Sequence, residues 1–144
     1  MTAWKSIWNL SALGLALLVS LFLATALADS PANRTPAELV QELMQKELTG
    51  VPGKELRMLT VEYPPGGASP PHRHHAQVFV YVLSGSLRMQ VQGSPEVTLQ
   101  SGQTFYEGPN DVHVVGRNAS STKPAKFVVV LVKEKGAPVL VPVK

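Results

Sequence analysis

Three histidines within four residues form the part of this sequence best suited to chemistry. His72, His74 and His75 directly follow Pro70 and Pro71. Successive side chains of an extended segment point to opposite faces, so this spacing predicts that His72 and His74 share a face and that His75 points away. Two imidazoles on one face can clamp a divalent cation. Taken alone, the pair could equally belong to a solvated surface.

The fourth histidine, His113, lies far along the chain, after the turn sequence at 108–111. Consecutive Gly, Pro, Asn and Asp residues are typical of a tight turn, so His113 should stand at the start of a strand. Glu107 precedes this turn. Two interpretations of Glu107 remain open: a general base or hydrogen-bond partner of a histidine, or an exposed carboxylate at a strand end.

Short strands must position these side chains. After Pro52, glycine or proline interrupts the sequence about every eight to twelve residues, a rhythm that predicts an all-β sandwich or barrel. The apolar run 78–83 predicts a strand buried on both faces. The strands are expected at 55–63, 77–83, 87–91, 97–99, 103–107, 112–118, 125–133 and 139–143.

One helix, over residues 35–49, is expected before the strands. Thr35-Pro36-Ala37-Glu38 has the pattern of a capping box with proline in the first helical position. Val40, Met44 and Leu48 follow at a spacing of four, which gives one apolar helix face. We expect this helix to pack on the barrel or on a neighbouring subunit.

Residues 1–28 have the pattern of a signal peptide. Lys5 supplies a positive start, the run 7–28 is largely apolar, and Ala26-Leu27-Ala28 is the small-x-small sequence that a signal peptidase accepts. We therefore expect an exported protein, periplasmic or secreted. The alternative is an uncleaved membrane anchor, because the run is nearly long enough to span a bilayer.

Composition narrows the function classes. The sequence contains no cysteine, which excludes disulfides, thiolate ligands and a cysteine nucleophile. Its net charge of +3 is too small and too scattered to suggest a nucleic-acid partner.

We expect three parts: the signal peptide, an N-terminal segment at 29–53 that holds the helix, and a β-barrel at 54–144.

The spacing of glycines and histidines resembles that of the cupin superfamily in its small single-domain form. Five residues separate Gly66 from His72-Arg73-His74, and Gly85 stands where the shorter first cupin motif requires glycine. Gly102 and His113 are spaced as the second motif demands. The resemblance implies a double-stranded β-helix, or jelly-roll barrel, with a metal on His72, His74 and His113.

The sequence departs from the family pattern at one ligand. The first cupin motif commonly supplies a glutamate, and its position here is Val78 or Phe79, neither of which binds metal. Gln77 is one residue early and would face the wrong way unless a bulge redirects it. The resemblance thus implies a three-histidine site completed by water, substrate or Gln77, suited to Fe²⁺, Zn²⁺, Mn²⁺, Ni²⁺ or Cu²⁺. A degenerate barrel without metal is the alternative.

The resemblance implies a metal-dependent enzyme, of the dioxygenase, isomerase or decarboxylase type, that acts on a small organic molecule. Glu107 is the candidate catalytic residue. The alternative is a module that binds or senses a small ligand, with or without a metal. We also expect a homodimer formed by the helix at 35–49 and the last strand near Val139, because unpaired edge strands invite aggregation. Membrane association is expected only if the leader stays uncleaved.

Overall fold

The computed structural model describes residues 37–143, and no helix lies among them. The predicted signal peptide and the first two residues of the predicted helix fall outside the described residues. Within the described range, no helix has the length and apolarity that a membrane crossing requires.

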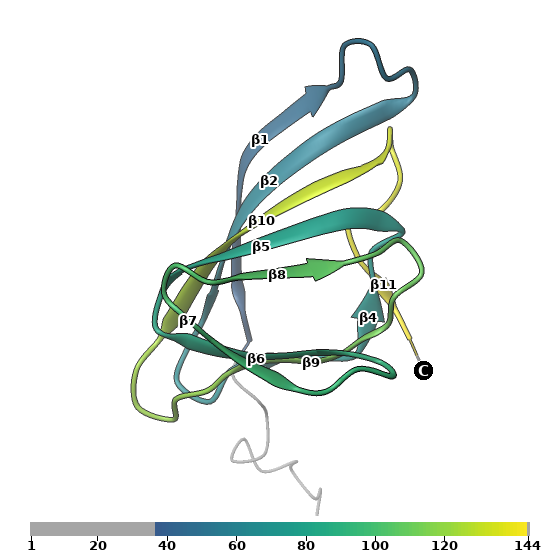
Figure 1. Cartoon of the computed structure of the whole chain (residues 1–144). Coiled ribbons are helices and arrows are strands. Elements are labelled where there is room, and N and C mark those ends of the chain that lie inside the picture. The colour runs from purple at the N-terminus through teal and green to yellow at the C-terminus, as the bar shows by residue number, and fades with distance from the viewer. Residues whose placement is uncertain (1–36, 144) are drawn as a thin grey trace, which may run out of the picture. The chain divides into compact units, whose positions relative to one another are not determined.

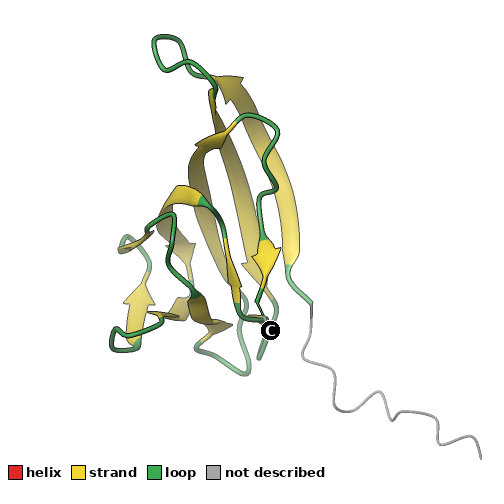
Figure 2. Ribbon diagram, turned by 90° about the vertical axis from the view of Figure 1, so that its right-hand side faces the viewer, coloured by secondary structure: helices red, strands yellow, loops and turns green. Residues whose placement is uncertain are grey.

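Two antiparallel sheets make up the described part of the chain (Figures 1 and 2). The five-stranded sheet runs in the order β1 (Leu39–Glu47), β2 (Lys54–Tyr63), β10 (Ala125–Glu134), β5 (Ala76–Ser84), β8 (Thr104–Glu107). The other runs in the order β11 (Val141–Pro142), β4 (His72–Arg73), β9 (His113–Asn118), β6 (Ser86–Val91), β7 (Val97–Gln100), and β3 (Ala68–Ser69) pairs with β9. The all-β prediction is confirmed, and the arrangement is consistent with a double-stranded β-helix.

The core lies between the inner faces of the two sheets. Strand residues alternate between core and outer face, as the two-residue period of a strand requires. On β5, for example, Val78, Val80 and Val82 are buried and their neighbours are exposed. Leu87 and Met89 of β6 meet them from the opposite sheet.

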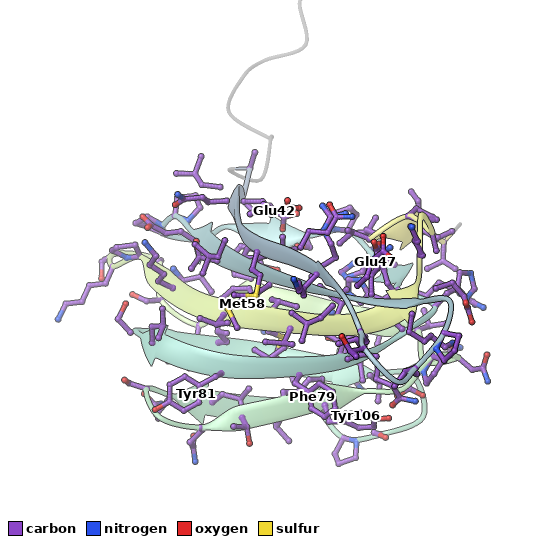
Figure 3. The ribbon with its side chains drawn as sticks, turned by 90° about the horizontal axis from the view of Figure 1, so that it is seen from above. Glu42, Glu47, Met58, Phe79, Tyr81 and Tyr106 are labelled. Atoms are coloured by element: carbon purple, nitrogen blue, oxygen red, sulfur yellow. The ribbon has the colours of Figure 1, made fainter. Side chains whose placement is uncertain are left out.

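The prediction that 78–83 is buried on both faces is wrong. Phe79, Tyr81 and Leu83 are 49%, 48% and 42% exposed, on the outer face of the five-stranded sheet. Figure 3 shows Phe79 of β5 beside Tyr106 of β8, with Tyr81 further along β5. The apolar run therefore combines a core face with an outer apolar face that no described residue covers.

The helix prediction is also wrong where the structure describes it. Residues 39–47 form β1, which pairs antiparallel with β2 from Leu39 opposite Glu62 to Glu47 opposite Glu55. The backbone groups at the edge of β2 thereby gain hydrogen-bond partners that a helix could not supply. A bulge at Leu43 interrupts the register of this pairing.

Candidate metal centre

His72 and His74 direct their Nε2 atoms at each other. His72 Nδ1 donates to the carbonyl oxygen of Pro70 at 2.7 Å, and His74 Nδ1 donates to that of Val139 at 2.6 Å. In each neutral ring the proton therefore sits on Nδ1, so Nε2 carries a free lone pair. The two Nε2 atoms are 3.1 Å apart. A carbonyl that fixes the tautomer in this way is a common support for a metal-ligating histidine.

His113 and Glu107 complete the cluster. His113 pairs directly with His72 across β9 and β4, and their ring centroids are 5.0 Å apart. A Glu107 carboxylate oxygen lies 3.5 Å from His113 Nδ1 and 3.8 Å from His74 Nε2. One ligand atom from each of these four residues lies within 4.8 Å of all the others. The structure thus brings the three predicted histidines together and adds Glu107, which is only 3% exposed.

Glu107 occupies the place of the missing motif glutamate, but from a neighbouring strand. Val78, one of the two positions where the cupin pattern would have the carboxylate, pairs directly with Glu107 across β5 and β8. Directly opposed residues in an antiparallel pair point to the same face. The carboxylate therefore reaches the histidines from one strand further along the sheet. The interpretation of Glu107 as an exposed strand-end residue is wrong.

Gln77 does not join the cluster. It is exposed on β5, where its side-chain oxygen accepts a hydrogen bond from Tyr106 on the outer face. No bulge redirects it, because the register of β5 against both neighbours is regular at this end. The sequence-based suggestion of Gln77 as a ligand is wrong.

The turns around the cluster fix its geometry. His75 is the one non-glycine residue between 37 and 143 with a positive φ, 46°, and it redirects the chain from β4 into β5 of the other sheet. Between β8 and β9, the Asp111 carboxylate accepts a hydrogen bond from the Gly108 backbone nitrogen at 2.7 Å. Asn110 in this turn does not have a positive φ. His75 itself is exposed, as predicted.

The C-terminal segment supports His74 from outside. The Val139 carbonyl that accepts the hydrogen bond from His74 belongs to residues 135–142, a segment that returns to pair with β4. Its position therefore depends on how this segment is held. Lys133 holds this segment, because its buried ammonium donates to the Ala137 carbonyl at 2.5 Å and to the Glu55 carboxylate. Val141 of β11 then pairs with Arg73 of β4. The predicted last strand near Val139 is therefore internal pairing of this chain.

Burial sets the protonation of the cluster. It raises the pKa of Glu107 to about 7, and the Asp111 carboxylate acts in the same direction. Burial, reinforced by the nearby His72, lowers the pKa of His113 to about 4. Burial also lowers the pKa of His74, against the opposing effect of the Val139 carbonyl. At neutral pH the environment thus favours neutral imidazoles at His74 and His113, the form that binds a metal.

The residues present fit a divalent cation. Both ring nitrogens of His113 are buried and have no hydrogen-bond partner, a costly arrangement unless another group satisfies one of them. Two nitrogens that each lie about 2.0–2.1 Å from one ion at a right angle are roughly 3 Å apart, close to the observed His72–His74 separation. Three imidazoles and one carboxylate suit the borderline metals of the first transition row.

A cavity of about 280 Å³ adjoins the cluster. The four candidate ligands line one part of it, and side chains from β2 and β10 supply half of the apolar lining residues. Leu59 and Val61 on β2 lie beside their register partners Val129 and Phe127 on β10, so the four side chains form one continuous apolar wall. Such a cavity suits a ligand smaller than a typical drug molecule.

The fold and the cluster agree with the family comparison. A family model for the cupin domain, Cupin_2, matches residues 59–131, which is half of the chain. The protein is therefore a small cupin, as the spacing of glycines and histidines predicted. No curated protein is significantly similar to the chain.

Solved structures share the fold at low sequence identity. An uncharacterised protein from Klebsiella pneumoniae with a double-stranded β-helix domain is 20% identical, over 80% of this chain and 90% of its own, with a TM-score of 0.59. An oxalate oxidase in complex with the substrate analogue glycolate is 25% identical, over 74% of this chain and 55% of its own, with a TM-score of 0.57. The DMSP lyase DddQ from Ruegeria pomeroyi is 22% identical, over 60% and 42%, with a TM-score of 0.53. The chain thus spans less than two thirds of these two enzymes.

Proposed function

We propose that this cupin binds one divalent cation through His72, His74, Glu107 and His113 and catalyses a reaction of a small organic molecule in the adjoining cavity. The observation that carries the proposal is the convergence of the His72 and His74 Nε2 lone pairs, 3.1 Å apart with both Nδ1 atoms already engaged. The buried, unpaired nitrogens of His113 support it.

Each protein group has a distinct task in this proposal. The three imidazoles hold the ion without cancelling its charge, and the Glu107 carboxylate removes one unit of positive charge. The bound cation would supply Lewis-acid chemistry or activate water or dioxygen. The apolar walls from β2 and β10 exclude water, which strengthens electrostatic interactions with a bound substrate. A dioxygenase, an isomerase and a decarboxylase all remain open as reaction types.

Metal analysis tests the proposal directly. Protein purified without a histidine tag should contain about one divalent metal ion per chain, and His72→Ala and His113→Ala should each reduce this to about a tenth or less. His75→Asn is the matched control, because His75 adjoins the site but is exposed, and asparagine tolerates a positive φ. Metal retention unchanged in His72→Ala would refute the site.

A binding or sensing module without catalysis is the second candidate. It is favoured by the position of Glu107 among the histidines, which removes the one general base suggested by the sequence. Turnover of small keto, hydroxy and aromatic substrates by the metal-loaded protein separates the two. Tight binding of a ligand without its conversion would favour the module.

We also propose that the protein is exported, on the support of the leader sequence at 1–28. The mature form should then begin at Asp29. Mass measurement of the protein recovered from its native host checks this, and an intact leader would refute cleavage.

A further inference from the structure

A second polar group faces the same cavity as the metal cluster. It consists of Tyr63 at the end of β2, Ser69 in β3 and Glu38 just before β1, and all three line the cavity. Tyr63 Oη lies 2.6 Å from Ser69 Oγ, and Ser69 Oγ donates to a Glu38 carboxylate oxygen. Tyr63 is only 2% exposed, so its hydroxyl can meet only the cavity and its protein neighbours.

The hydrogen bonds that link Tyr63, Ser69 and Glu38 all point in one direction, toward Glu38. An ionised carboxylate only accepts hydrogen bonds, so the single hydroxyl hydrogen of Ser69 points at Glu38. Ser69 can then only accept from Tyr63, and the Tyr63 hydrogen points at Ser69. What Tyr63 offers to the cavity is therefore a lone pair. A buried acceptor without a donor costs free energy that a suitable ligand would recover.

Tyr63 lies next to the metal cluster. A methyl group placed on Gly116 would be 2.8 Å from His113 Cε1 and 3.2 Å from Tyr63 Oη, so the ring and the hydroxyl both lie close to the same point on β9. Because both also line the same cavity, a small ligand there can contact the cluster and Tyr63 at once. Between these two polar groups the wall is apolar.

Resting on the proposed metal site, we infer that Tyr63, Ser69 and Glu38 select a ligand that carries a hydrogen-bond donor. The substrate class is a small, mostly apolar molecule with an oxygen anion for the metal and a hydroxyl or ammonium group for Tyr63. The negative charge of Glu38, the last member of this hydrogen-bond series, repels a second anionic group of the ligand near Tyr63. A dicarboxylate is therefore excluded, whereas a hydroxy acid or an amino acid fits.

Paired probes test this inference. Straight-chain carboxylic acids of four to eight carbons and their ω-hydroxy counterparts differ in a single donor group. Binding of each is measured by calorimetry to full-length protein saturated with Ni²⁺, with the metal content of every sample determined. At one or more chain lengths the ω-hydroxy acid should bind about tenfold more tightly than the plain acid, since a buried acceptor discriminates against a ligand that leaves it unpaired.

Variants assign the preference to the hydrogen-bond chain. Tyr63→Phe should abolish it while leaving the plain acids and the Ni²⁺ content unchanged. Ser69→Ala keeps the Tyr63 hydroxyl but frees its hydrogen, so the preference should fall to about threefold or less. Tyr106→Phe is the matched control, because the Tyr106 hydroxyl is on the outer face and donates to Gln77.

The outcomes separate this inference from the metal site. Wild-type protein that takes up Ni²⁺ but shows no preference at any chain length overturns the donor selection alone. A preference that survives in both Tyr63→Phe and Ser69→Ala also overturns it. Wild-type protein that takes up no Ni²⁺ overturns the metal site and the inference together.

Discussion

At the scale of single residues, the central fact is the approach of two imidazole lone pairs. His72 Nε2 and His74 Nε2 repel each other at 3.1 Å unless a proton or a metal ion lies between them. Burial lowers the pKa of His74, which disfavours the proton. The pair is therefore better satisfied by a cation shared with His113 and Glu107.

Glu107 should control the pH dependence of metal uptake. Its pKa of about 7 means that it holds a proton at pH 6, whereas the metal needs the ionised carboxylate. His113, with a pKa of about 4, is already neutral at that pH. Zn²⁺ uptake at pH 6 should therefore release about one proton more per chain from the wild type than from Glu107→Gln, measured with a pH indicator in weak buffer.

The same pKa values give the sign of the effect on affinity. Metal binding to the wild type should weaken as the pH falls from about 7 to 5, because Glu107 takes up a proton there. In Glu107→Gln this loss should be smaller across that range, and the affinity at pH 8 should be lower than in the wild type. Equal proton release by the two proteins would contradict the assignment of Glu107 as a ligand.

Gly116 should be required for the orientation of His113. A methyl group there would meet the ring at 2.8 Å, so the ring must move out of the cluster. We expect Gly116→Ala to weaken metal binding about 10–100-fold, the usual cost of disturbing a group that orients a ligand. Competition with a chelator measures this. Gly108→Ala is the control, since its added methyl group meets Asp111 only at an ordinary 3.4 Å, and a similar loss there would argue against the specific clash.

At this scale the sequence predicts the histidines but not the fourth ligand. His72 and His74 share a motif, and their common face follows from the strand period. The role of Glu107 depends on its position opposite Val78, which is a property of strand pairing. Register between strands is set by contacts across the whole sheet, so a search along the sequence near Gln77 could not find it.

At the scale of elements, β1 shows how local signals can mislead. The capping-box pattern at 35–38 and the four-residue spacing favour a helix, but pairing with β2 prevails from Leu39 onward. Glu38, the expected capping glutamate, instead accepts a hydrogen bond from Ser69 beside the cavity. Later strands were predictable because glycine and proline separate them and because their residues alternate.

Gly85 should be the glycine whose side-chain hydrogen matters most for stability. Its φ of 76° is unfavourable for other residues, and an added methyl group would lie 2.6 Å from the carbonyl oxygen of Pro124. Gly93 has a similar φ of 86° but open space around it. We expect Gly93→Ala to lower the free energy of unfolding by about 1 kcal/mol and Gly85→Ala by more, about 2–3 kcal/mol or above, in urea denaturation. Equal losses would mean that conformational strain alone matters at both positions.

At the scale of the whole molecule, the homodimer remains a prediction, but its expected surface changes. The helix proposed for it is a strand, and the last strand pairs with β4 inside the chain. The outer face around Phe79, Tyr81 and Tyr106 is the better surface (Figure 3), because a monomer rarely leaves a contiguous apolar patch uncovered.

The charges bordering this face favour a second copy of the chain over an oppositely charged partner. Lys126 lies 3.9 Å from Glu62, and Lys54 contacts Glu134, so these side chains neutralise each other within one chain. An apolar face bordered by neutral pairs offers little attraction to a strongly charged protein. Packed against itself about a two-fold axis, it would bury the aromatic side chains without bringing unpaired like charges together.

Disrupting the outer face should therefore change the oligomeric state without changing the metal site. We expect the wild type to be a dimer by light scattering, and Phe79→Ser combined with Tyr106→Ser to be a monomer with the same metal content. Val51→Ser is the control, because Val51 is a comparably exposed apolar residue in the β1–β2 loop. A monomeric wild type would refute this interface. Loss of metal in the double variant would show that the outer face is coupled to the metal site through β5 and β8, because the inner face of β8 carries Glu107.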